Sequence, residues 1–149
     1  MHLASMNFQN GAIVRFVLWL LFAVGVTGCL PVTTAKIQLG AGYNAAEMDR
    51  AEAIVERLGF SRIMFEPRGE KALPRARYPD EWVSNFELNK AFGVSVSFSM
   101  KDGSLTVGFA ERNTRFSAEG EELLRTLTAE MRSTYGDKVS ISDGGPGAH

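Results

Sequence analysis

The strongest structural signal in this sequence is the alternation of large apolar and small side chains in residues 92–111, FGVSVSFSMKDGSLTVGFAE. Alternation with a period of two places successive side chains on opposite faces of a strand. The dipeptide Asp102-Gly103 divides the segment and is typical of a two-residue type I′ hairpin turn. The sequence therefore predicts two antiparallel strands with one apolar face and one face of Ser, Thr, Gly and Ala.

The turn also predicts which residues face each other across the hairpin. Pairing outward from a two-residue turn gives three facing pairs on the apolar side: Met100 with Leu105, Phe98 with Val107, and Val96 with Phe109. Met100 is accordingly expected in the core, together with Met48 and Met131. The opposite face, with Ser95, Ser97, Ser99 and Thr106, either meets water or admits the close approach of a partner.

Two segments have the apolar spacing of amphipathic helices and carry boundary residues at both ends. In the first, Asn44 is the predicted N-cap, with Glu47 three residues on as in a capping box, and Gly59 ends the helix. In the second, Ser117 is the predicted N-cap and Gly136 ends the helix. The residues predicted to face the core are Met48, Ala51, Val55 and Leu58 in the first helix and Leu124, Leu127, Met131 and Tyr135 in the second.

Shorter strands complete the predicted fold. They are expected at residues 36–39, 62–66 and 139–141, whereas residues 84–90 (SNFELNK) fit either a strand or a helix. The elements predict an α+β two-layer sandwich: a mainly antiparallel sheet of about four strands with two helices on one face. Residues 36–143 form this single domain, and the glycine-rich residues 144–149 form a flexible tail.

The amino-terminal region has a pattern typical of exported proteins. Residues 16–26 are an almost wholly apolar run, which is short for a membrane span of about 20 residues. The run leads into Val26-Thr27-Gly28-Cys29, an aliphatic residue and two small ones followed by the only cysteine of the chain. This tetrapeptide resembles the lipobox of bacterial lipoproteins, and the resemblance covers the first 29 residues only.

The resemblance implies how this protein is processed and where it lives. Residues 1–28 are then a signal peptide, and Cys29 receives a diacylglyceryl group and, on its new amino terminus, an acyl chain such as palmitate. Residues 29–35 form a tether, and Leu30 resembles the residue that sorts such proteins to the outer membrane, facing the periplasm. An uncleaved signal anchor over residues 16–35 is the alternative, and Met6 is an alternative start to Met1.

Composition excludes several classes of function for the chain that remains after cleavage. Residues 29–149 carry 15 basic and 17 acidic side chains, without the basic excess typical of nucleic-acid binding. One cysteine excludes an internal disulfide and a Cys-rich zinc site. The two histidines are His2, in the signal, and His149, the last residue. We therefore expect no catalytic constellation, no metal site and no cofactor.

One loop stands out as a candidate contact surface. Residues 67–82 contain three prolines and are rich in arginine, and aromatic residues lie close by. Arginine and aromatic side chains are favoured at protein interfaces. A guanidinium group can also form a bidentate pair of hydrogen bonds with a carboxylate or a phosphate. The candidate binding residues are Arg68, Lys71, Arg75, Arg77, Tyr78 and Trp82. Solvation of a long loop, with Trp82 packed in the core, is the simpler explanation.

Together these features favour a lipid-anchored lipoprotein of the cell envelope that acts as a non-catalytic binding or assembly module. Its expected partners are the membrane, through the lipid, and an envelope protein or polymer. Two alternatives stay open: a cell-wall glycan or lipid hydrolase that uses Asp80 or Glu81 beside Trp82, and an immunity or inhibitor protein. A second polar cluster, Glu111-Arg112-Asn113 with Arg115, is expected to be a solvated strand end with local ion pairs.

Overall fold

A computed structural model of the protein describes residues 31–66 and 71–144, which belong to one compact unit. Its helices are α2 (Ala45–Arg57), α3 (Ala118–Tyr135) and the short 3-10 helix η1 (Gly136–Lys138). Its strands are β1 (Thr33–Gly40), β2 (Ser61–Ile63), β3 (Ala76–Arg77), β4 (Glu81–Leu88), β5 (Phe92–Ser99), β6 (Leu105–Glu111) and β7 (Ser140–Gly144). Among these described residues, no helix is both long and apolar enough to cross a membrane.

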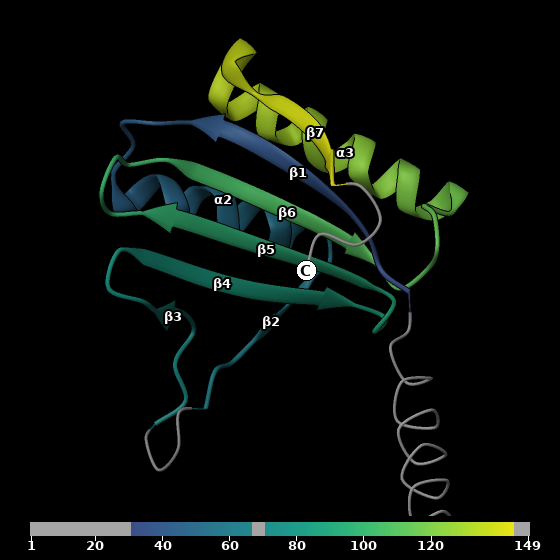
Figure 1. Ribbon diagram of the computed structural model, residues 1–149, viewed down its shortest axis with the longest axis horizontal. Coiled ribbons are helices and arrows are strands. Elements are labelled where there is room, and N and C mark those ends of the chain that lie inside the picture. The colour runs from purple at the N-terminus through teal and green to yellow at the C-terminus, as the bar shows by residue number, and fades with distance from the viewer. Residues whose placement is uncertain (1–30, 67–70, 145–149) are drawn as a thin grey trace, which may run out of the picture. The chain divides into compact units, whose positions relative to one another are not determined.

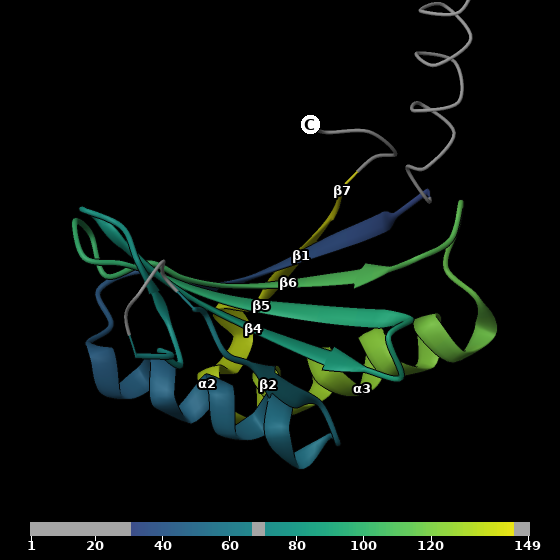
Figure 2. The same cartoon turned by 90° about the horizontal axis from the view of Figure 1, so that it is seen from below.

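All strands belong to one antiparallel sheet with the order β2-β4-β5-β6-β1-β7, and β3 pairs with the outer edge of β4. Helices α2 and α3 both lie against the same face of this sheet (Figures 1 and 2). The predicted α+β architecture with two helices and an antiparallel sheet is therefore confirmed. The predicted number of about four strands is wrong, because the sheet has seven.

The additional strands come from segments whose pattern was ambiguous or short. Residues 84–90 lie mostly in β4, which pairs with β5 along its whole length. Its alternation is hard to recognise because a polar residue, Ser84, occupies one of the buried positions. Strand β3 lies inside the segment predicted to be a loop. Strand β2 is three residues long, Ser61–Ile63, and shares only residues 62 and 63 with the predicted strand at 62–66. Strand β1 begins at Thr33, within the predicted tether.

The predicted hairpin is present, but its register differs by two residues. The facing pairs are Phe98 with Leu105, Val96 with Val107, and Val94 with Phe109. Strand β5 ends at Ser99, and residues 100–103 form a four-residue loop. Because the shift is an even number of residues, the predicted apolar and small-residue faces are both preserved. Met100, however, lies in the loop and is 44% exposed, so its predicted core position is wrong.

The loop takes this length because it is held from two sides. Met100 N donates a hydrogen bond to Asp80 O, and Tyr43 N donates to Gly103 O. Gly103 has φ +64° and approaches Tyr43 so closely that a Cβ atom would lie 2.5 Å from the Tyr43 carbonyl oxygen. Only glycine satisfies both requirements. Contacts with distant residues therefore determine the turn, in addition to the local Asp-Gly preference.

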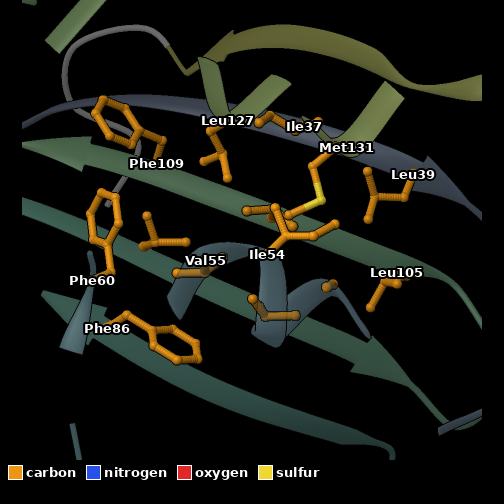
Figure 3. Packing of buried hydrophobic residues seen from close by; sticks show 14 of the residues in the cluster. Ile37, Leu39, Ile54, Val55, Phe60, Phe86, Leu105, Phe109, Leu127 and Met131 are labelled. Carbon is orange, nitrogen blue, oxygen red and sulfur yellow. The ribbon is translucent and has the colours of Figure 1, made fainter. Parts of the chain in front are cut away.

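The hydrophobic core fills the space between the helices and one sheet face (Figure 3). Val55 on α2 and Met131 on α3, both predicted to face the core, are fully buried, as is Met48. Both predicted N-caps are also present: Asn44 Oδ1 accepts a hydrogen bond from Ala46 N, and Ser117 Oγ accepts one from Gly120 N. The helices therefore begin where the sequence predicts.

The start of α3 is fixed by a buried carboxylate at the end of β6. Glu111 is 5% exposed, and its Oε2 atom accepts a hydrogen bond from Ser117 N at 2.9 Å. This arrangement places a negative charge at a helix amino terminus, where it is favourable. Gly120 leaves room for the carboxylate, since a Cβ atom there would lie 2.0 Å from Glu111 Oε2 and 3.4 Å from the Phe92 ring.

Gly120→Ala should destabilise the domain by about 1–3 kcal/mol, because the added methyl group displaces a buried and hydrogen-bonded carboxylate. Helix propensity alone predicts the opposite sign, a gain of about 1 kcal/mol. Urea unfolding followed by circular dichroism measures the difference. Ser133→Ala, at an exposed position of the same helix, is the control and should change little. A Gly120→Ala variant that is more stable than the wild type would show that the Glu111 carboxylate can move aside without loss of stability.

Candidate functional site

The described part of the arginine-rich loop is attached to helix α2 through one buried carboxylate. Glu52 is 3% exposed and accepts hydrogen bonds from Arg75 Nε at 2.7 Å and from an Arg62 terminal nitrogen at 2.8 Å. The hydroxyl of Ser84 on β4 donates a further hydrogen bond to it. Asp49, one turn earlier on α2, also pairs with Arg75. These contacts form the Glu52 cluster: Asp49, Glu52, Arg62, Arg75 and Ser84.

The charges of this cluster support one another electrostatically. Burial by itself would raise the pKa of Glu52, but hydrogen bonds from Arg75, Arg62 and Ser84 outweigh burial and hold the pKa below the usual 4.5. The hydrogen bond to Glu52 likewise raises the pKa of Arg75. Arg62 also lies over the ring of Phe86, at 4.8 Å from its centre. Glu52 is therefore ionised at neutral pH, and the cluster joins α2, β2, β4 and the loop.

The predicted binding residues separate into two groups in the structure. Arg75 belongs to the Glu52 cluster, and its side chain is only 18% exposed. Arg77 and Tyr78 are exposed at the surface, as is Lys71. Trp82 is half-buried, packs on Phe98 and lies within 6 Å of both the Arg75 and Arg77 guanidinium groups. Two further candidates, Cys29 and Arg68, lie outside the described residues.

Arg77 and Tyr78 lie next to the hairpin loop, which the sequence did not indicate as part of a site. Tyr78 N donates a hydrogen bond to Glu81 O, and Met100 N donates one to Asp80 O. These bonds bring residues 78–81 and the 100–103 loop together. Tyr78 is 56% exposed and Met100 is 44% exposed. We name Arg77, Tyr78, Met100 and Lys101 the distal surface. The exposure of Met100 could not be predicted without the length of the hairpin loop, and that length depends on the hydrogen bond from Met100 N to Asp80 O.

The register of the sheet places this surface far from the start of the domain. Thr33, Phe92 and Glu111 are paired neighbours at one end of the sheet, here called the proximal end. The distal surface adjoins the opposite end, where β5 stops at Ser99. An eight-residue strand that rises about 3.3 Å per residue separates the two ends by about 23 Å. A group bound at the distal surface is therefore remote from the first residue of β1.

The sheet face opposite the helices carries the predicted row of small hydroxyl residues. A hollow of about 390 Å³ lies on this face and is lined mainly by small and polar residues: Thr34, Ala35, Lys36, Glu81, Ser95, Ser97, Thr106, Gly108, Phe109 and Ala110. Glu81 is the one member of the Asp80-Glu81 pair in this lining. Ser95 Oγ lies over Gly108, where a Cβ atom would approach it to 2.6 Å.

Metal-binding side chains do not gather in the part of the chain that the structure describes, since no group of three or more His, Cys, Asp or Glu residues there has suitable geometry. The sequence matches no known family model and no curated protein. The geometry of the described residues and the amino-terminal pattern therefore carry the functional argument.

Glu52→Gln should destabilise the domain by about 3 kcal/mol at neutral pH, the lower end of the range for removing one partner of a buried ion pair, because both arginines keep some exposure. Glu56→Gln, which affects an exposed partner of Arg62, is the control and should cost less than about 1 kcal/mol.

The same variants also test the pH dependence. Because folding lowers the pKa of Glu52, its stabilisation is fully present above pH 4.5 and is lost as the pH falls through the folded value. Urea unfolding at several acidic pH values should show a steeper loss of stability in the wild type than in Glu52→Gln. Equal pH dependence in both proteins would contradict an ionised Glu52.

Proposed function

We propose that this protein is a lipid-anchored lipoprotein of the bacterial cell envelope and acts as a non-catalytic binding or assembly module. The observation that carries the proposal is the position of Cys29, at the end of an apolar segment and directly before the first strand of the fold. The proposed location is the outer membrane, facing the periplasm. The resemblance to a lipobox supports the anchor, and the exposed side chains of the distal surface support the binding role.

The spacing between the cysteine and the fold is short. Leu30, Pro31 and Val32 separate Cys29 from Thr33. A fully extended chain covers at most about 3.6 Å per residue, so about 14 Å is the greatest distance between the Cα atoms of Cys29 and Thr33. A lipid on Cys29 therefore keeps the proximal end of the sheet close to the membrane. The distal surface, at the other end of the strands, is then free to meet a partner.

The chemistry of the distal surface suggests what that partner presents. Arg77 offers a guanidinium group that lies over the Trp82 ring and makes no ion pair with any side chain the structure describes. Tyr78, the next residue, and Met100 add exposed apolar area. Tyr, Met and Arg are the residue types enriched at protein interfaces. We therefore propose an envelope protein or polymer with a carboxylate or phosphate next to an apolar group.

Cys29→Ser should abolish lipidation and release the protein from membranes. The reason is that the thiol is the only site for the diacylglyceryl group, and two or more acyl chains are needed for stable anchoring. Growth with labelled palmitate followed by membrane fractionation measures both effects. Cys29→Ser is compared with Thr34→Ser, a conservative change just inside the fold. A labelled Cys29→Ser protein would contradict the lipoprotein assignment.

Arg77→Glu combined with Tyr78→Ala should weaken partner binding by roughly 5- to 30-fold, the effect of losing about 1–2 kcal/mol at an interface centre. Photo-crosslinking in intact cells, from a reactive side chain placed at Lys101, reports the complex as a single dominant product. Arg132→Glu, which makes the same charge change on the exposed side of α3, is the matched control. Arg75 is unsuitable for this test because its substitution would break the Glu52 cluster.

Two results of this experiment would count against the distal surface. One is a crosslinked product of equal yield in the double variant and the wild type. The other is a product that forms equally well from a reactive side chain at Ser133, on α3, which would indicate that contact is not selective for this surface.

A further inference from the structure

Three exposed cationic side chains lie at the proximal end of the sheet. Lys90 lies in the turn between β4 and β5, and Arg112 and Arg115 follow the end of β6. All three are exposed, and none makes an ion pair with a side chain that the structure describes. The local ion pairs expected for the cluster around Arg112 are therefore not present there. We name these three residues the proximal surface.

Backbone contacts bring these cations to the start of β1. Arg112 N donates a hydrogen bond to Ala91 O at 2.9 Å, which joins the β4–β5 turn to the segment after β6. Thr33 Oγ1 donates one to Asn113 O at 2.8 Å, which joins the first residue of β1 to the same segment. The residue that continues from the proposed tether therefore lies directly beside the cationic segment.

Lys90 lies in a backbone conformation that is unfavourable for lysine. Asn89 and Lys90 have φ values of +53° and +56°, in the left-handed region. Asparagine tolerates this region and glycine prefers it, whereas a lysine there is strained. Observed strain of this kind is a reason to look for a function. The sequence thus places a cation where glycine would favour folding.

Carboxylates lie near these cations along the chain, but none that the structure describes forms an ion pair with them. Glu111 is buried and occupied at the start of α3, and Glu122 is paired with Arg125. Glu87 lies near the end of β4, and Glu119 and Glu121 lie in the first turn of α3. The proximal surface therefore offers three exposed and unpaired cations and not a net positive charge.

We infer that the proximal surface binds the anionic headgroups of the membrane that holds the protein. This inference rests on the proposed function, because the lipid on Cys29 brings the start of β1 within reach of the membrane. Charge complementarity supplies the contact: exposed Lys and Arg side chains close to a membrane are attracted to anionic lipids. The contact fixes the direction of the strands, so that the distal surface points away from the bilayer and does not tumble on its tether.

The experiment uses the full chain as processed and lipidated by the bacterium, reconstituted into vesicles of phosphatidylcholine with or without phosphatidylglycerol. A fluorophore is attached at Thr114→Cys, between the two arginines, or at Ala41→Cys, beyond the other end of β1. Headgroup-attached quenchers report proximity to the bilayer. We expect stronger quenching at position 114 than at position 41. Because the tether already limits the distance from the bilayer, the contact itself is measured by the increase in quenching at position 114 when phosphatidylglycerol is present. High salt should reduce it, because salt screens exposed charges.

Lys90→Ser, Arg112→Ser and Arg115→Ser should each lower the ratio of docked to undocked protein roughly fivefold, and the triple variant should abolish docking. Lys90→Gly distinguishes the effect of the lysine charge on docking from an effect on the stability of the fold. It removes the strained conformation, so docking should fall by the same factor while the unfolding temperature stays the same or rises. Arg57→Ser, an exposed arginine on α2, is the control and should dock normally.

Quenching at position 114 that is as strong in the triple variant as in the wild type, or that is equal without phosphatidylglycerol, would overturn the inference. Equal quenching at positions 41 and 114 would overturn it as well. These failures differ from a failure of the proposed function: a purified chain without lipid on Cys29 refutes the anchor itself. A lipidated chain whose position 114 is not quenched refutes the proximal contact alone.

Discussion

The carboxylate of Glu52 is the interaction on which the rest of the candidate site depends. It is enclosed between α2 and β4 and is neutralised by arginines from β2 and from the segment before β3. A buried charge is tolerated only when its hydrogen bonds are satisfied, so this carboxylate holds all four segments in place. Because Glu52 binds Arg75, Arg77 is the arginine of this segment that remains exposed and could meet a partner.

Local sequence patterns were sufficient for the elements whose stability is decided locally. The faces of the β5–β6 hairpin, the Asn44 and Ser117 caps and the core positions of Met48 and Met131 all follow from spacing and end residues. Strand β4 was ambiguous because Ser84 occupies a core position. A serine is acceptable there only because its hydroxyl meets Glu52, which lies 32 residues away. No local pattern contains that information.

The candidate site was less predictable than the fold for the same reason. Arg75 and Arg77 are separated by one alanine and look equivalent in the sequence, yet one is tied to Glu52 and the other is exposed. Met100 continued the apolar alternation, but its backbone bond to Asp80 takes it out of the strand. Residue type indicated a candidate region of the chain, whereas long-range partners decide which of its side chains are exposed.

The place of β1 in the sheet links the proposed anchor to the proposed binding surfaces. This strand is paired with β6 on one side and β7 on the other, so the tether enters the fold at an interior strand. Both neighbouring ladders resist its displacement, so under the proposed lipid anchor the short connection would transmit the position of the membrane to the whole sheet. Because every strand is parallel or antiparallel to β1, the proposed contact of its start with anionic headgroups would also fix the direction in which Arg77 and Tyr78 are presented.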